Sequence, residues 1–589
     1  MIEKNDVPLT VYQLIQQSAE RFGDATALTY LQAISPEFVD ETISFSALLG
    51  NINRVVRLLR DSLDNSTEEH PVVSFLLPNI PQAHYILWGA ETAGIANPLN
   101  PLLNEDALVG LMSKAKTDIL IALGPNPVSD IWEKAQAVAD RLPKKPKLIS
   151  VAFPASDDSP LFDALLPEYS DEPLPVQWLP AADDIAAYFH TGGTTSTPKL
   201  ALQTHTNQLS TADAYVRSMN STAGEVGVNG MPLFHVAGAL VIGLGSLAAG
   251  VNSVLPTMAG FRNPQVIARH WDIVERYHVS ISGGIPTSLA AMVEVPIGEA
   301  DISTLRLMLT GGAPMSLSVA DDITKLTGRP LHQMYGMTEA AGSITMPNLS
   351  CAPLPGSAGH IRDDVEIRID TDSADARGVG EICVRGPMVF PGYLGSDTSP
   401  LDDGWLRTGD LGYIDANNNL FITGRAKDLI IRSGHNIDPA MIEASLESHP
   451  AVSMAAAVGK PDAYAGELPV VYVQLHPEHT VDEAELRDYA MAHIDERPAC
   501  PKEVFILEAL PITAVGKIHK PTLRAKAAAR VVRDALAEFE VEVKAIVLNS
   551  GGLQVEVCSA DSNKQLAAVC GELAGRLSLN IVVVARLAA

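Results

Sequence analysis

A buried apolar strand that runs into a glycine- and hydroxyl-rich turn limits the fold of this chain more than any other feature. Residues 186–189 are Ala-Ala-Tyr-Phe, and residues 190–199 are His-Thr-Gly-Gly-Thr-Thr-Ser-Thr-Pro-Lys. Short apolar runs of this kind are typical of buried strands. In α/β proteins a glycine-rich turn at the end of a strand is a place where ligands bind. The sequence therefore predicts an α/β fold with a ligand site at the end of this strand.

The turn has the composition of a polyphosphate-binding loop. Its glycines can bring the backbone close to a ligand, and its N–H, hydroxyl and ammonium groups can bind anionic oxygen atoms. Its spacing differs from that of a Walker A loop, which requires Gly-Lys-Ser/Thr. A surface loop rich in Ser, Thr and Gly is the alternative, but the buried strand before the turn favours a binding loop. The candidate phosphate-binding residues are Thr191, Gly192, Gly193, Thr194, Thr195 and Lys199.

This turn resembles the phosphate-binding motif of the adenylate-forming superfamily, which includes acyl-CoA synthetases, peptide-synthetase adenylation domains and luciferases. The motif of that superfamily is T-S/G-G-T-T-G-x-P-K-G. Gly192 fits the variant of the fatty-acyl members, whereas Ser196 and Leu200 stand where the superfamily usually has glycine. The resemblance implies that the turn holds the phosphates of ATP.

Two later segments resemble the parts of the superfamily that hold adenine and the metal ion. Residues 309–314, Leu-Thr-Gly-Gly-Ala-Pro, are similar to the adenine-binding segment, and 335–339, Tyr-Gly-Met-Thr-Glu, match Y-G-x-T-E. The resemblance implies that Tyr335 presents its ring to adenine, that Thr338 bonds a phosphate oxygen, and that Glu339 binds Mg²⁺. In the first segment the implied adenine contacts are Gly311, Gly312 and Ala313.

Three segments farther along the chain match the ribose site and the moving parts of the same superfamily. Asp410, in Trp-Leu-Arg-Thr-Gly-Asp, is expected in a turn after a strand, where its carboxylate can accept both ribose hydroxyl groups. The segment 424–437 matches G-R-x-K-D-x-I-x-x-x-G-x-N-I, which implies that Arg425 reaches the ribose and Lys427 is the hinge. In this segment Gly434 would line the tunnel for the thiol acceptor. The segment 511–517 resembles P-x-T-x-x-G-K, which makes Lys517 the lysine of the adenylation step.

The long uncharged stretch 226–261 bears on the acid that is bound. It is too often interrupted by polar residues and proline to cross a membrane, so we expect a buried helix with its flanks and no membrane span. The resemblance places His235 at the mouth of the carboxylate pocket. Amino-acid-activating members carry an aspartate in this region, and this stretch contains no acidic residue. An apolar acid, fatty or aryl, is therefore favoured over an amino acid.

Alternating helix and strand patterns extend over the first third of the chain and imply parallel sheets covered by helices on both faces. The fold class expected from these patterns and from the resemblance is α/β. A large N-terminal domain has parallel-type sheets covered by helices and a small barrel-like subdomain, and a smaller mobile α+β C-terminal domain follows. Helices are expected at 9–22, 45–63 and 83–96, and strands at 72–77, 119–123 and 148–153.

Three domains are expected, namely an adenylation domain over 1–424, a mobile domain over 425–530 and an α/β extension over 531–589. In the extension we expect helices over 521–539 and 564–577 and strands over 541–548, 553–557 and 580–584. Three pairs of aspartates, at 183–184, 363–364 and 402–403, are expected to lie in solvated turns.

Composition sets limits on partners and location. The chain has 589 residues, too many for one core, and its net charge of −28 disfavours a nucleic-acid partner. The odd number of cysteines, five, without metal-like spacing, suits buried thiols in a reducing compartment. No signal peptide is recognised, so we expect a cytoplasmic protein, with a homodimer as an open alternative for its assembly.

The resemblance implies an ATP-dependent acyl-CoA synthetase of fatty acid metabolism, which uses ATP, Mg²⁺ and coenzyme A. It would form an acyl-adenylate and pyrophosphate, and then a thioester and AMP. An acyl-AMP ligase that feeds the phosphopantetheine arm of a carrier protein is the nearest alternative, and a luciferase-like oxygenase is more distant. A silent nucleotide- or lipid-binding module is disfavoured because Glu339, Asp410, Arg425 and Lys517 are all retained.

Overall fold

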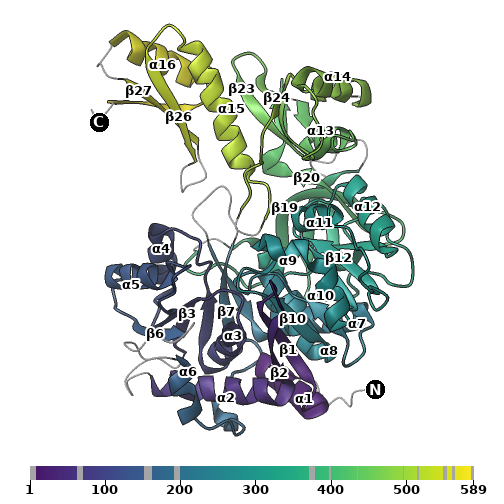
Figure 1. The fold of residues 1–589 in the computed structure, drawn as a ribbon. Helices are drawn as coiled ribbons and strands as arrows, with labels where there is room; N and C mark the ends of the chain where they lie inside the picture. The colour runs from purple at the N-terminus through teal and green to yellow at the C-terminus, as the bar shows by residue number, and fades with distance from the viewer. Residues whose placement is uncertain are drawn as a thin grey trace.

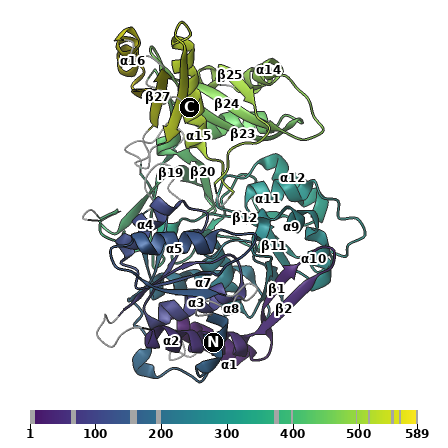
Figure 2. The same cartoon turned by 60° about the vertical axis from the view of Figure 1, so that its left-hand side comes forward.

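The structure, a computed structural model, has a large N-terminal part and a smaller C-terminal lobe. In Figures 1 and 2 the green and yellow C-terminal elements gather at one end of the molecule, and the purple to teal elements form the rest. This arrangement confirms the expected fold class. The described residues are 8–62, 70–151, 162–191, 199–370, 378–396, 399–433, 435–494, 496–513, 516–547, 553–559 and 564–585.

Two mainly parallel sheets form the body of the N-terminal part. In each of them one antiparallel pair, β1–β2 or β7–β8, lies at an edge. The first has the order β13 (Leu331–Met334), β12 (Leu307–Gly311), β11 (Ile281–Gly284), β9 (Val226–Val228), β10 (Asn252–Pro256), β1 (Thr26–Ala33) and β2 (Val39–Ser44). The second has the order β6 (Lys147–Val151), β5 (Ile119–Leu123), β3 (Val72–Leu76), β4 (Ile95–Pro98), β7 (Ile185–His190) and β8 (Leu200–Thr204).

Helices on these sheets form where apolar residues recur on one face. In α2 (Phe45–Asp61) the buried residues include Leu48, Ile52 and Val55, and the Ser44 hydroxyl caps the helix by accepting the N–H of Ala47. The other helices of the N-terminal part that bear on the expected pattern or on the site are α1 (Val11–Phe22), α3 (Pro81–Ala93), α4 (Glu105–Ala115), α5 (Ile131–Arg141), α7 (His205–Met219), α11 (Pro286–Val293) and α12 (Leu317–Thr327).

The stretch 226–261 contains the buried helix with flanks that was expected, and its flanks are strands. Its ends form β9 and β10, and between them lie a π-helix (Ala237–Leu244) and the short α8 (Gly245–Ala249). The expectation did not specify the flanks, because an apolar run has the same composition in a buried strand as in a buried helix and periodicity does not separate them.

A five-stranded antiparallel sheet takes the place of the expected barrel-like part and leads into the C-terminal lobe. Its strands are β16 (Glu366–Asp370), β17 (Gly380–Arg385), β18 (Leu401–Asp402), β19 (Trp405–Ile414) and β20 (Leu420–Arg425). The lobe contains β21 (Ile430–Arg432), β22 (His435–Ile437), β23 (Val452–Asp462), β24 (Gly466–Leu475), β25 (Glu503–Ile506), α13 (Pro439–Glu447) and α14 (Glu483–His493).

One helix joins this lobe to the last part of the chain. In α15 (Lys520–Ala535), Leu523 and Ala527 pack with β23 and β24, whereas Ala528 and Val532 pack with the final sheet. The expected domain boundary at 530 thus falls inside a helix that contributes to both cores. The final sheet has β26 (Val541–Val547) and β27 (Leu553–Ser559) antiparallel and β28 (Asn580–Ala585) parallel to β27, with α16 (Lys564–Leu577) between them in the chain.

Candidate active site

The residues predicted to hold the nucleoside, Tyr335 for adenine and Asp410 and Arg425 for the ribose, meet in one hydrogen-bonded cluster. The Tyr335 hydroxyl donates to Asp410 Oδ2 at 2.5 Å, and Arg425 Nε donates to Asp410 Oδ1 at 2.7 Å. Burial, followed by the negative charge of Asp410, raises the pKa of Tyr335 well above its usual value, so the phenol stays protonated and donates. Asp410 lies within β19, opposite Arg425 of β20, and not in the turn that was expected. The prediction was wrong because a Thr-Gly-Asp sequence is typical of a turn, whereas here the pairing of β19 with β20 extends the strand through Asp410.

The carboxylate expected to bind Mg²⁺ lies on a short 3₁₀ turn, Thr338–Ala340, and is buried. Glu339 Oε1 accepts a hydrogen bond of 2.6 Å from the Tyr393 hydroxyl. Among the described residues no cluster of three His, Cys, Asp or Glu side chains could hold a metal by itself. A single oxygen-ligand carboxylate fits Mg²⁺, which is usually bound through one or two carboxylates plus the phosphates of the substrate.

Only the ends of the phosphate loop belong to the described part of the chain. Thr191 follows β7, and its backbone N–H donates to the carbonyl of Lys199 at 2.8 Å, so the loop is closed at its base. The Lys199 ammonium lies 4.7 Å from the centroid of the Tyr393 ring. The remaining predicted loop residues, Gly192, Gly193, Thr194 and Thr195, lie outside the described residues, as does Ser196.

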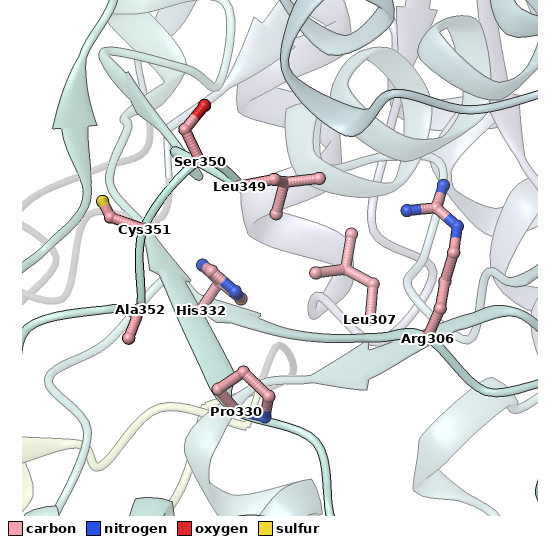
Figure 3. A pocket seen from close by; sticks show the side chains of 8 residues that line it. All are labelled: Arg306, Leu307, Pro330, His332, Leu349, Ser350, Cys351 and Ala352. Carbon is pink, nitrogen blue, oxygen red and sulfur yellow. The ribbon is translucent and has the colours of Figure 1, made fainter.

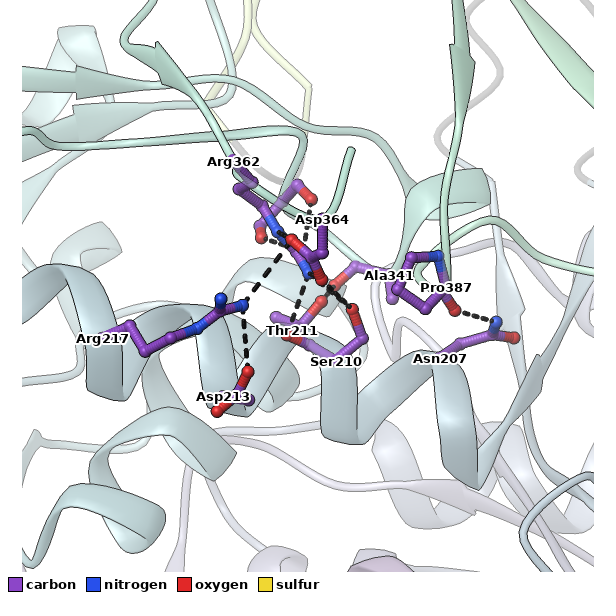
Figure 4. Close-up of polar contacts among 10 residues, drawn as sticks. Asn207, Ser210, Thr211, Asp213, Arg217, Ala341, Arg362, Asp364 and Pro387 are labelled. Atoms are coloured by element: carbon purple, nitrogen blue, oxygen red, sulfur yellow. Dashed lines mark hydrogen bonds and ion pairs between the residues drawn. The ribbon is translucent and has the colours of Figure 1, made fainter. Parts of the chain in front are cut away.

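Side chains of α7 and of β8 hold carbonyl groups in and directly after the Thr338–Ala340 turn, and Figure 4 shows the contact between α7 and Ala341. The Thr211 hydroxyl of α7 donates to the carbonyl of Ala341 at 3.0 Å. From the strand before α7, the fully buried Gln203 Nε2 donates to the carbonyl of Thr338 at 2.7 Å. Thr204 is the cap of α7, and Asn207 closes the capping box from the third position.

The buried Arg362 ties the same helix to the chain beyond the turn. Its guanidinium donates to the carbonyl of Ser343 at 2.8 Å and to the carbonyl of Ser210 at 3.0 Å, and it pairs with Asp364 at 2.6 Å. Figure 4 shows Arg362 and Asp364 facing α7. The expectation of a solvated Asp363–Asp364 turn is therefore wrong for Asp364, because a buried guanidinium needs a carboxylate beside it.

The ring of His235 is a neutral hydrogen-bond donor. Its Nδ1 accepts the backbone N–H of Ala237 at 3.2 Å, so the ring proton is assigned to Nε2. Burial, and next the positive charge of Lys517 and the neighbouring His190, lowers the pKa of His235 to about 3. At neutral pH the ring can therefore offer an N–H to a carboxylate but carries no charge. The nearby His190 stacks on Phe234, with ring centroids 5.8 Å apart.

The predicted lysine of the C-terminal lobe reaches into the N-terminal part. Lys517 Cε lies 3.6 Å from the position that a Cβ on Gly312 would occupy. The preceding Gly516 has φ +75°, and a Cβ there would collide with Ile285. Its carbonyl accepts the Thr287 hydroxyl of α11 at 3.0 Å. The lobe is thus docked through its own backbone, and the motif's glycine is required by this close approach.

The charges around Lys517 match the chemistry expected of it. Burial, and then the positive charge of Arg425, lowers the pKa of Lys517, whereas Asp410 and Glu339 act in the opposite direction. The ammonium is therefore within electrostatic reach of Arg425, Asp410 and Glu339. Lys427 lies on the 3₁₀ turn Ala426–Asp428 between β20 and β21, the segment that joins the lobe to the N-terminal part.

Asp428, the last residue of this turn, pairs with Arg524 of α15 at 2.6 Å. Gly434 lies outside the described residues. Of the expected adenine contacts, Gly311 is the last residue of β12, and Gly312 and Ala313 follow it.

Two cavities border the edge strand β13 close to the expected adenine segment. The smaller, of about 230 Å³, reaches Thr310 and Gln333, whose strands lead into Gly311 and Tyr335. The larger, of about 500 Å³, is shown in Figure 3 and contains none of the predicted site residues. It is lined by Arg306, Leu307, Pro330, His332, Leu349, Ser350, Cys351 and Ala352. Cys351 is exposed, so the expectation of uniformly buried thiols is wrong for this residue.

Sequence reasoning missed four residues that take part in these contacts. They carry no motif signal, because each acts through a partner far away in the chain. The missed residues are His190, Gln203, Thr287 and Tyr393.

Family models match most of the chain. Residues 15–394 match the model described as AMP-binding enzyme, and residues 441–517 match AMP-binding enzyme C-terminal domain. Among the described residues, none of the helices combines the length and the hydrophobicity that a membrane crossing needs.

Two curated relatives of this chain and one similar solved structure are CoA ligases or a CoA synthetase by name. The chain is 34% identical to "Marinolic acid--CoA ligase" of Pseudoalteromonas sp. (strain SANK 73390), over 96% of this chain and 89% of that protein. It is 27% identical to "Long-chain-fatty-acid--CoA ligase" of Bacillus subtilis (strain 168), over 88% of this chain and 96% of that protein. A solved structure similar to this chain is the o-succinylbenzoate CoA synthetase of Bacillus subtilis in complex with its acyl-adenylate intermediate. It superposes with a TM-score of 0.71 at 26% identity, over 87% of this chain and 97% of that protein.

Proposed function

This chain belongs to the AMP-binding enzyme family, in the acyl-CoA ligase branch of the adenylate-forming superfamily, and from that premise we propose which acid it activates and which residues do so. It is an acid–thiol ligase. We propose a hydrophobic acid, fatty or aryl, that becomes an acyl-adenylate and then a CoA thioester. The observation that carries the site assignment is the insertion of Lys517 beside Gly312, among the charges of Asp410, Arg425 and Glu339.

The first half-reaction requires neutralisation of the negative charges on the carboxylate and the phosphates, and it requires no general base. A carboxylic acid with a pKa of about 4.3 is already ionised at neutral pH. Lys517 neutralises the junction at which the carboxylate oxygen forms a bond to the α-phosphorus while the bond to pyrophosphate breaks. The Nε2–H of His235 donates to the other carboxylate oxygen and orients it. Mg²⁺ bound through Glu339 would add charge neutralisation on the phosphates.

The nucleotide is held by the groups that surround Asp410. The ribose hydroxyl groups bond to Asp410, whose carboxylate is held from both sides by Tyr335 and Arg425. The purine lies between the Tyr335 ring and Gly311–Gly312–Ala313, with the 230 Å³ cavity at its edge. The loop from Thr191 to Lys199, with Thr194 and Thr195, binds the phosphates together with Thr338. The docked lobe shields the adenylate from water.

The second half-reaction requires the thiol to arrive where Lys517 stands. We propose that the lobe of residues 425–530 turns about Lys427, which removes Lys517 and brings Gly434 to the pantetheine path. The N-terminal domain of residues 1–424 stays fixed, and 531–589 is an α/β extension of the lobe. A cytoplasmic location is consistent with the five free thiols, and monomer and homodimer are both compatible with these contacts.

Proline at the hinge should separate the two half-reactions. Lys427→Pro fixes φ near −65°, so the lobe should remain in one orientation. We expect adenylate formation to stay within a few-fold of wild type, whereas thioester formation falls about 100-fold or more and acyl-adenylate accumulates. Rapid quench with radiolabelled ATP measures both steps. Lys427→Ala, which leaves the backbone free, is the control, and an unchanged ratio of the two rates in the proline variant would refute the hinge.

A pyrophosphate-release screen tests the function. Fatty acids of increasing length and a set of aryl acids are supplied with ATP, Mg²⁺ and free CoA. We expect AMP, pyrophosphate and the acyl-CoA with apolar acids, and no turnover with amino acids. Adenylate formation that yields a thioester only with a carrier-protein arm would favour the acyl-AMP ligase. ADP and inorganic phosphate as products would refute the proposal.

A further inference from the structure

We propose that Tyr393 is a positioning residue that sets the Glu339 carboxylate and the Lys199 ammonium at a fixed separation on the phosphates of ATP. This inference rests on the proposed function, because it takes Glu339 as the metal carboxylate and Lys199 as a phosphate ligand. Tyr393 lies outside every segment that identified the site.

One side chain touches both charged groups, with different parts of the same ring. Its hydroxyl donates to Glu339 Oε1 at 2.6 Å, and its ring centroid lies 4.7 Å from Lys199 Nζ. The ring is rigid and has only two side-chain torsions. A shift of Tyr393 would therefore move the carboxylate and the ammonium together.

The backbone around Tyr393 is fixed to the strand that follows the phosphate loop. Tyr393 forms an isolated bridge with Ala201 of β8, and the N–H of Leu394 donates to the carbonyl of Leu200 at 2.9 Å. On the other side the N–H of Phe390 donates to the carbonyl of Glu339 at 3.0 Å. The segment 390–394 thus links β8 to the turn that carries Glu339, and Tyr393 repeats that link with its side chain.

The hydrogen bond leaves one carboxylate oxygen for the cation. The Tyr393 hydroxyl donates to Oε1 of Glu339. Oε2 accepts no hydrogen bond from the described residues. Partners that orient a metal-binding carboxylate typically change metal affinity or activity 10–100-fold when they are removed.

Two substitutions separate the two contacts. Tyr393→Phe removes the hydroxyl but keeps the ring under Lys199, and Tyr393→Leu removes both. The binding of Mn²⁺ in the presence of ATP is followed by electron paramagnetic resonance of the free ion, and the binding of ATP in EDTA is followed by calorimetry. For Tyr393→Phe we expect about 10–100-fold weaker Mn²⁺ binding, with ATP affinity in EDTA within twofold of wild type.

For Tyr393→Leu we expect the same loss of Mn²⁺ affinity and, in addition, several-fold weaker ATP binding in EDTA, because Lys199 loses the ring face. Tyr413→Phe, on a ring that stacks on Phe421 and lies on β19, is the matched control and should change neither affinity. If the leucine variant does not fold, the phenylalanine variant alone decides the carboxylate half of the proposal.

Unchanged Mn²⁺ affinity in Tyr393→Phe overturns the inference, as does an equal loss of ATP affinity in EDTA, which would indicate a general disturbance of the site. The proposed function would fail differently. In that case the wild-type protein itself would bind neither ATP nor Mn²⁺ with ATP, and the variants would have nothing to lose.

Discussion

Lys517→Ala is expected to slow adenylate formation by about 10²–10³-fold and to leave thioester formation from supplied acyl-adenylate within a few-fold. The reason is the position of Lys517, which projects from a backbone held by Thr287 onto the charge cluster of the N-terminal part. In that cluster it is the group that can neutralise the attacking carboxylate. After the adenylate has formed, the same side chain has no role in attack by the thiol.

Acid-dependent exchange of pyrophosphate into ATP measures the first step, and conversion of synthetic acyl-adenylate with CoA measures the second. Lys526→Ala is the matched control, because Lys526 is an exposed lysine of α15 in the same lobe. It should retain both activities. Equal losses of the two half-reactions in Lys517→Ala would contradict the division of labour between the two orientations of the lobe.

Glu91→Gln is expected to stabilise the protein by about 3 kcal/mol at pH 7. Glu91 is fully buried in α3, where its Oε1 accepts Gln208 Nε2 at 2.9 Å and its Oε2 has no partner among the described residues. Burial raises the pKa of Glu91 to about 8, although the hydrogen bond from Gln208 opposes the shift. The folded protein therefore holds a proton at pH 7 that the unfolded chain, with a pKa near 4.5, has released.

The sign of the pH dependence follows from that difference in bound protons. Between about pH 4.5 and 8 the folded state binds the extra proton, so the wild-type free energy of unfolding falls by about 1.4 kcal/mol per pH unit from this group. Glutamine does not titrate, and its amide can donate to Gln208 Oε1, which is buried without a partner. The advantage of the variant should therefore widen by about 2 kcal/mol between pH 6 and pH 8.

Urea unfolding at pH 6, 7 and 8 measures this effect. Glu172→Gln, at an exposed loop carboxylate of the same part of the chain, is the control and should leave stability unchanged within about 0.5 kcal/mol at each pH. A pH-independent difference between Glu91→Gln and wild type would mean that Glu91 is ionised in the folded protein.

The sequence predicted the site where chemistry is concentrated in short motifs, and it failed where geometry comes from distant pairing. Asp410 and Arg425 were assigned to the ribose and Tyr335 to adenine, and the three side chains form one hydrogen-bonded cluster. Asp410 lies inside a strand because β19 pairs with β20, and no local sequence pattern predicts that pairing. In the stretch 226–261 the buried helix was expected, but its flanking strands were not, because strands and helices there are equally apolar.

The supporting residues could not have been found in this way. Gln203 and Tyr393 act on Thr338 and Glu339 across more than fifty residues of chain, and nothing in their immediate sequence distinguishes them from other buried side chains. Their role becomes visible only when packing brings the partners together.

The helix α15 gives the extension a mechanical role that its own sheet does not reveal. One side of α15 is buried against β24 and the other against β27. The three-stranded sheet is therefore packed rigidly on the lobe and moves with it. If the lobe rotates about Lys427, the three-stranded sheet rotates with it. Because the sheet lies far from Lys427, a small rotation there gives a large displacement of the sheet. A molecule bound to the three-stranded sheet would move with the lobe once in every turnover. Such a bound molecule would slow the cycle.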